Sequence, residues 1–254
     1  RSGVPPFVRF WHPSAGALRG SPPVVEAIAR LDATHPPGTR TVYGDLGFIL
    51  LAAAVEAVTG EPLDRWLARE VWAPLRMADT GFRPLDRGVP AAGIAPTERD
   101  AVVRHTHVRG VVHDENAYAM GGVAGHAGLF STARDLARFA GMLLGGGRVG
   151  EVRLLRPETV ARFTAPAAGA ERALGWDVRS PKGVGAAFGD SAFGHTGFTG
   201  TSIWIDQERK LFVILLTNHV NPTRDLGGIG ELRRTVHEIA GLRRAGDRAT
   251  PGTG

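Results

Sequence analysis

The sequence predicts an α+β fold in which an antiparallel sheet is flanked by helices and accompanied by a helical subdomain. Near the C-terminus, residues 201–205 are β-branched and aromatic, and residues 211–217 form a continuous apolar run. The polar residues 206–209 between them suit a hairpin, so the two strands are expected to be antiparallel. Residues 225–241 then repeat apolar side chains every three or four positions, which predicts a helix packed on the sheet.

Two helix-like segments follow one another in the first half of the chain. Residues 43–58 are apolar nearly all round, which predicts a buried helix that ends at Gly60. Pro62 suits the first position of a second helix, which Pro74 ends. One apolar stripe supports this second helix: Leu63, Trp66, Leu67 and Val71. This pair of helices forms the centre of the predicted helical subdomain.

Segments rich in proline and glycine predict loops. Residues 1–38 are expected to be mostly loop, with one short helix at residues 24–31. Residues 83–118 have no sustained period, and we expect a long irregular excursion of the kind that is usually functional or mobile. The small residues at 121–128 permit close backbone approach.

Short helices and strands are expected to alternate in the rest of the chain. A capping box at residues 132–135 predicts a helix to Leu144, and Pro157 begins another helix through Phe163. Strands are expected at residues 174–178 and 187–195. The predicted organisation is therefore a mainly helical part, residues 1–150, a sheet-and-helix part, residues 151–243, and a disordered tail, residues 244–254.

Composition narrows the possible functions. The chain has 254 residues, of which 43% are hydrophobic, and no cysteine, which excludes disulfides, a thiol nucleophile and a cysteine-built zinc site. No apolar run has the length that a membrane span needs. The net charge of +5 comes almost wholly from scattered arginines, which we attribute to coding bias and a solvated helix face, so no nucleic-acid partner is expected.

Two short motifs carry the candidate chemistry. The tripeptide His195-Thr196-Gly197 directly precedes the predicted hairpin, and Gly197 and Gly200 leave backbone N–H groups uncovered, as binding of an oxyanion requires. The tripeptide Tyr43-Gly44-Asp45 opens the apolar helix, about 150 residues earlier. Taken alone, each has an ordinary structural explanation, because a tyrosine packs at helix starts, a histidine fits a strand and a carboxylate suits a helix N-terminus. Their pairing favours a catalytic role.

In this order and separation, the motifs resemble the Y-x-N and K-T-G elements of the serine β-lactamase and penicillin-binding-protein superfamily. The segment G-G-V-A-G-H-A-G-L-F-S-T-A at residues 121–133 extends the resemblance, which covers roughly residues 1–240. The phrase V-H-D-E-N at residues 112–116 points to the penicillin-binding-protein 4B-like and esterase branch. The resemblance implies a β-lactamase/D,D-peptidase-like fold that hydrolyses an ester, a D-Ala peptide or a β-lactam through an acyl-enzyme.

The resemblance also gives a role to each matching residue. Tyr43 would relay the proton of the nucleophilic serine to the leaving group. Thr196, next to Gly197, would hydrogen-bond the substrate, and the N–H of Phe198 matches one oxyanion donor. The other oxyanion donor belongs to the serine itself.

Two positions depart from the family pattern. His195 stands where lysine is usual; it would donate to the substrate carboxylate or to Tyr43, but it is charged only part of the time near pH 7. Asp45 replaces an asparagine, and because a carboxylate only accepts hydrogen bonds, recognition of a penicillin-type amide is put in doubt. With both family lysines missing, the Tyr43 phenol is expected to stay protonated at neutral pH.

The nucleophile of the family is absent from this chain. In the S-x-x-K motif a lysine follows the serine by three positions, and none of the seven serines here meets that condition. We therefore expect that the chain lacks an N-terminal part of a larger protein, including the first strands of the sheet, and is inactive by itself. The resemblance implies no metal or organic cofactor, a small-molecule or cell-wall-derived substrate, and a periplasmic, extracellular or membrane-associated location.

Two alternative functions stay open. A non-catalytic relative would bind cell-wall fragments or a protein partner. A metal-dependent hydrolase would instead use the polar cluster in the irregular excursion, since histidine-x-histidine beside a further histidine and aspartate offers the residue types that bind zinc. The candidate ligands are His105, His107, His113 and Asp114.

Overall fold

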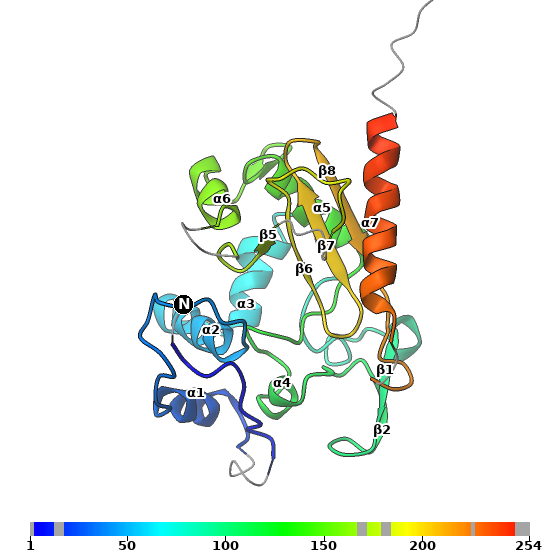
Figure 1. Cartoon of the computed structure of the whole chain (residues 1–254). Helices are drawn as coiled ribbons and strands as arrows, with labels where there is room; N and C mark the ends of the chain where they lie inside the picture. Colours follow the sequence, from blue (N-terminus) through cyan, green and yellow to red (C-terminus); the bar gives the residue numbers. More distant parts are fainter. Residues whose placement is uncertain (1–2, 13–17, 167–171, 179–183, 225–226, 247–254) are drawn as a thin grey trace, which may run out of the picture. The chain divides into compact units, whose positions relative to one another are not determined.

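The structure, a computed structural model, describes residues 3–12, 18–166, 172–178, 184–224 and 227–246 (Figure 1). The chain divides into two compact units, residues 1–132 and residues 133–254. The division falls at the start of α5 (Ala133–Leu144), whereas the sequence pattern places the change at residue 150. Helix α5 belongs to the second unit because it contacts strands β7 (Ser202–Asp206) and β8 (Leu211–Leu215).

Helices dominate the first part of unit 1. They are α1 (Ser21–Ala29), α2 (Leu46–Thr59) and α3 (Leu63–Leu67), and α3 continues into a π-helical turn, η2 (Ala68–Trp72). As predicted, α2 ends at Gly60, which has a left-handed φ of 70°. The expected complete burial of α2 is wrong, because only Leu46 and Ile49 are buried and Val58 is 87% exposed.

Residues 83–118 form regular elements, so the expected irregular excursion is also wrong. They contain η3 (Ala91–Gly93), the antiparallel strands β1 (Pro96–Asp100) and β2 (Thr106–Arg109), and helix α4 (Glu115–Ala119). Both strands consist mainly of polar and charged residues, and in β2 only Val108 is buried. The strands therefore lack the apolar alternation by which a strand is predicted from sequence.

Unit 2 contains the predicted antiparallel sheet. Its strand order is β5 (Asp177–Val178), β6 (Phe193–Thr196), β7 and β8. The predicted hairpin is confirmed, with Asp206 of β7 opposite Leu211 of β8. Strands β5 and β6 are shorter than the segments predicted for them, although Phe193 of β6 still pairs with Val178 of β5 and with Ile205 of β7.

Helices α5 and α7 (Ile229–Gly246) both contact β8, and Figure 1 shows α7 running along this strand. Helix α6 (Pro157–Thr164) begins at the predicted proline, and β3 (Arg148–Val149) pairs with β4 (Val152–Arg153). Helix α7 is longer than predicted and includes part of the expected tail; residues 247–254 lie outside the described residues.

No single helix in the described parts of the chain is both long and apolar enough to cross a membrane. The core of unit 2 includes the buried residues Val184, Phe188, Ala192 and Trp204.

Candidate active site

The tyrosine motif lies at the N-terminus of α2 in unit 1. The Asp45 N–H donates to the Pro6 carbonyl at 2.9 Å, and a Cβ on Gly44 would lie 2.4 Å from the Pro6 Cα. Glycine is therefore required at the middle position of the motif, because the backbone of residue 6 passes directly against it. The Tyr43 side chain is 56% exposed, so it is not the packed helix-start residue that its position alone suggests.

Asp45 belongs to a cluster of ionisable groups that the sequence does not reveal. One ligand-type atom from each of Asp45, Asp114 and His126 lies within 4.8 Å of the others. The Nε2 atom of His126 lies 2.8 Å from Oδ1 of Asp114. A Cβ on Gly125 would lie 2.1 Å from the Phe48 carbonyl oxygen, so the glycine allows the segment that carries His126 to pack on α2.

The pKa values of the two carboxyl groups in this cluster are shifted in opposite directions. Burial raises the pKa of Asp45, the charge of His126 lowers it and the charge of Asp114 raises it. Burial also acts to raise the pKa of Asp114, but the His126 hydrogen bond and the Ala117 amide outweigh it, and the net shift is downward. The 2.7 Å bond from the Ala117 N–H makes Asp114 the N-cap of α4.

The metal site predicted from the histidines is not assembled. Nε2 of His113 pairs with Glu98 at 2.8 Å, and Nε2 of His107 lies 3.2 Å from the Thr97 carbonyl oxygen. Within the described residues, the only group of three potential ligands is the Asp45–Asp114–His126 cluster. The expected ligands do not converge on one position: His105, His107, His113 and Asp114.

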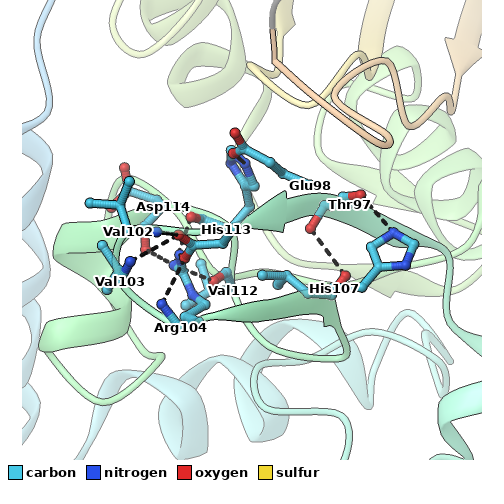
Figure 2. Close-up of polar contacts among 11 residues, drawn as sticks. Thr97, Glu98, Val102, Val103, Arg104, His107, Val112, His113 and Asp114 are labelled. Carbon is cyan, nitrogen blue, oxygen red and sulfur yellow. Dashed lines mark hydrogen bonds and ion pairs between the residues drawn. The ribbon is translucent and has the colours of Figure 1, made fainter.

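A buried ion pair positions the segment that leads into Asp114. The Asp100 carboxylate accepts from the Arg104 guanidinium at 2.7 Å and from three backbone amides, those of residues 102–104. Arg104 in turn donates to the carbonyl oxygens of Val112, His113 and Asp114 (Figure 2). Burial opposes ionisation of Asp100, but these donors outweigh it and hold the pKa of Asp100 well below its usual range.

The second motif lies in unit 2, on strand β6, which ends at Thr196. Nη2 of Arg172 lies 2.9 Å from Nε2 of His195, and Nδ1 of His195 lies 2.9 Å from the Thr196 carbonyl oxygen. A guanidinium only donates hydrogen bonds, so Nε2 is the acceptor and Nδ1 carries the proton. In this arrangement His195 is a neutral imidazole, and the positive charge beside the motif belongs to Arg172. Arg172 also pairs with Asp177. No local pattern in the sequence identifies it.

The turn after the motif is held by its own backbone. The Gly197 N–H donates to the Thr201 carbonyl at 2.8 Å, and the Gly200 N–H donates to the Gly197 carbonyl at 3.1 Å. Gly200 has a φ of 119°, and a Cβ there would lie 2.4 Å from Oγ1 of Thr217. The Phe198 side chain is 70% exposed, and the Arg224 guanidinium lies 5.8 Å from its ring centroid. The backbone on both sides of Phe198 is therefore held by hydrogen bonds within the turn.

Ser202 and His237 also form a polar pair beside this turn. Oγ of Ser202 lies 3.0 Å from Nε2 of His237, and both residues are buried. Burial, with a contribution from the charge of Arg233, lowers the pKa of His237 to about 4. A serine beside a neutral imidazole suggests a nucleophile and its base. Burial closes this pair to a substrate, so its role is structural.

Comparison with known proteins agrees with the motifs and the fold. The Beta-lactamase family profile matches residues 1–237. A "Putative D-alanyl-D-alanine carboxypeptidase" of Escherichia coli strain K12 is 39% identical over 222 residues, which cover 80% of this chain and 51% of that protein. An "N-acetylmuramyl-L-alanine amidase" of Bacillus subtilis strain 168 is 37% identical over 237 residues, covering 86% of this chain and 54% of the relative. The chain thus spans about half the length of these curated relatives.

Solved structures with lower identity share the fold. A simvastatin synthase variant from Aspergillus terreus superposes with a TM-score of 0.67 at 20% identity, covering 96% of this chain and 64% of that one. A beta-lactamase from Mycobacterium bovis gives a TM-score of 0.59 at 24% identity, with coverage of 84% and 68%. With the family profile matching nearly the whole length and both motifs in their expected elements, the chain belongs to the beta-lactamase family.

Proposed function

We propose that this chain supplies the tyrosine and H-T-G motifs of a serine hydrolase that works through an acyl-enzyme. The observation that carries the proposal is the position of Thr196 at the end of β6, directly before a glycine-supported turn that contains Phe198. Such a turn suits an oxyanion donor, because its backbone is ordered before the substrate arrives. The serine nucleophile is not among residues 1–254, since no serine here has a lysine three positions later.

In the proposed mechanism, Tyr43 and Thr196 act on the same substrate. The Tyr43 phenol passes the proton of the serine to the leaving group, and Thr196 hydrogen-bonds the substrate. The Phe198 N–H, together with the N–H of the serine, stabilises the negative charge on the tetrahedral intermediate. The cation that would recognise a substrate carboxylate is Arg172 rather than His195, since the imidazole is neutral beside that guanidinium.

The proposed substrates are amides of the bacterial cell wall. Two relatives at 37–39% identity have names that describe cell-wall amide hydrolysis, a carboxypeptidase and an amidase. The same acyl-enzyme mechanism also applies to esters and β-lactams. A non-catalytic module that binds cell-wall fragments is the second candidate.

The test is covalent labelling of a longer protein that contains this chain together with an S-x-x-K segment. We expect a fluorophosphonate or a penicillin to give one adduct by mass spectrometry, on the serine of that motif. The Thr196→Val and Tyr43→Phe variants should label at least tenfold more slowly, in line with the usual contribution of a proton-transfer group. The 254-residue chain is the negative control. An unlabelled longer protein that still binds muropeptides would support the binding module instead.

A further inference from the structure

Arg233, on the second turn of α7, binds both ends of the turn that follows the H-T-G motif. Its Nη2 atom donates to the Gly197 carbonyl oxygen at 2.6 Å and to the Thr201 carbonyl oxygen at 2.8 Å. Burial lowers the pKa of the Arg233 guanidinium, yet an arginine keeps its charge at any pH at which the protein is folded. A partly buried cation is thus hydrogen-bonded to two carbonyl groups that bracket Phe198.

One of these carbonyl groups is electronically joined to the predicted oxyanion donor. The Gly197 C=O and the Phe198 N–H belong to the same peptide group, whose atoms share a delocalised bond. A cation that binds the oxygen withdraws electron density from the nitrogen and makes the N–H a stronger donor. The bond to Arg233 therefore acts on the atom that would face the developing negative charge.

Other contacts fix the orientation of this peptide group. Oγ1 of Thr217 donates to the Gly200 carbonyl at 2.8 Å, which secures the far side of the turn. One helical turn after Arg233, on the same face of α7, His237 bonds to Ser202 at the start of β7. The helix thus binds the end of the β6–β7 hairpin at two successive turns.

We propose that Arg233 is a positioning residue that orients and polarises the Gly197–Phe198 peptide group for oxyanion binding. The catalytic part of this inference rests on the function proposed above. The polarisation itself is a property of the 254-residue chain and can be measured without any turnover. Arg234 offers a matched control, because it is the neighbouring arginine and pairs instead with Glu238 at 3.3 Å.

The first experiment is NMR spectroscopy of the isotope-labelled 254-residue chain. In Arg233→Met, the Phe198 amide nitrogen and the Gly197 carbonyl carbon should both move upfield, and the amides of residues 197–201 should exchange at least tenfold faster. In Arg234→Met these signals should stay in place. Arg233→Gln keeps a hydrogen-bond donor without charge, so it should shift the two signals in the same direction by less. If Arg233→Met does not fold, Arg233→Gln alone decides. Unmoved Phe198 and Gly197 signals in a folded variant would overturn the proposal.

The second experiment is steady-state kinetics with a nitrophenyl ester, in a longer protein that carries the serine nucleophile. Removal of a complete oxyanion donor typically lowers kcat about 100- to 1000-fold, so a weakened donor is expected to lower it about tenfold. Arg233→Met should show this loss with KM unchanged, and Arg234→Met should match the wild type. A raised KM with unchanged kcat would refute the polarising role. If even the wild-type protein is inactive, the proposed function fails, while the NMR result still decides whether Arg233 polarises the peptide group.

Discussion

The Arg172 guanidinium donates to Nε2 of His195 across 2.9 Å, and this bond fixes the state of the imidazole. The other ring nitrogen, Nδ1, lies 2.9 Å from the Thr196 carbonyl oxygen. In this arrangement the histidine that replaces the usual lysine is a neutral ring, and the cation next to it is Arg172, which also pairs with Asp177. Under the proposed function, an anionic substrate would meet Arg172, a residue outside the motif.

Replacing Arg172 should change the tautomer of His195. In the wild-type chain at pH 8, long-range ¹H–¹⁵N spectra should show the proton on Nδ1 alone. In Arg172→Met, Nε2 loses its donor, and a mixture of the two neutral tautomers is expected. Arg234→Met serves as the control and should leave the His195 signals unchanged. A wild-type spectrum with the proton on Nε2 would contradict the hydrogen-bond assignment.

Buried His237 should make stability fall in mildly acidic solution. Its pKa is about 4 in the folded chain, against about 6.5 for an unperturbed histidine. Between these values the unfolded chain binds a proton that the folded chain does not, so lowering the pH favours unfolding by up to roughly 3 kcal/mol. Urea titrations at pH 7 and at pH 4.5 should show this loss in the wild type and a smaller one in His237→Gln. Equal losses in the two proteins would refute it.

The Asp100–Arg104 pair should be costly to break. Arg104→Met would leave a buried carboxylate without its cation and three carbonyl groups without a donor, and a loss of about 3–5 kcal/mol is expected. The Asp100→Asn/Arg104→Met double variant should recover part of this loss, because no buried charge remains. Urea unfolding of the wild type, both single variants and the double variant measures the coupling. Additive losses would show that the two side chains are independent.

Gly200 should tolerate no side chain. Its φ of 119° is unfavourable for other residues, and an added Cβ would meet Oγ1 of Thr217 at 2.4 Å. Gly200→Ala is therefore expected to destabilise the chain by about 1–3 kcal/mol. Gly141 lies within α5 and has open space around it, so Gly141→Ala should stabilise by up to about 1 kcal/mol. Thermal unfolding of both variants tests this contrast, which fails if the two shifts have the same sign.

Asp45→Asn, which restores the usual family residue, should stabilise the chain at neutral pH. The pKa of Asp45 is raised by burial, so its stabilising contribution is present in acid and is lost as the pH rises through the folded-state pKa. The variant should therefore exceed the wild type in stability at pH 7 and match it near pH 3. Urea midpoints at the two pH values give the comparison. A gain that persists at pH 3 would point to packing rather than to charge.

The parts of the fold that sequence predicts well are those encoded by local apolar patterns. The β7–β8 hairpin follows from one apolar run and one polar link, and the end of α2 follows from Gly60. The β1–β2 hairpin escapes prediction because a buried Asp100–Arg104 pair stabilises its turn, and charged residues suggest a loop. Contacts between polar residues that are distant in sequence are equally hard to predict. Arg172 and His195 are separated by 22 intervening positions, which no periodicity connects.

The same limit applies to the candidate site. The tyrosine motif and the H-T-G motif each consist of three consecutive residues, so both can be recognised from the sequence alone. Two groups that bind near these motifs come from other elements: His126 from a glycine-rich loop and Arg233 from the C-terminal helix. Their roles appear only when the backbone brings them to Asp114 and to the Gly197 carbonyl. Roles of this kind depend on geometry more than on residue type.

Strand β8 ends the sheet, and no strand among the described residues pairs with its outer edge. The strand reads L-F-V-I-L, without charge or proline, which is the composition of segments that recruit identical copies edge to edge. Concentrated solutions of this 254-residue chain should therefore form oligomers through β8.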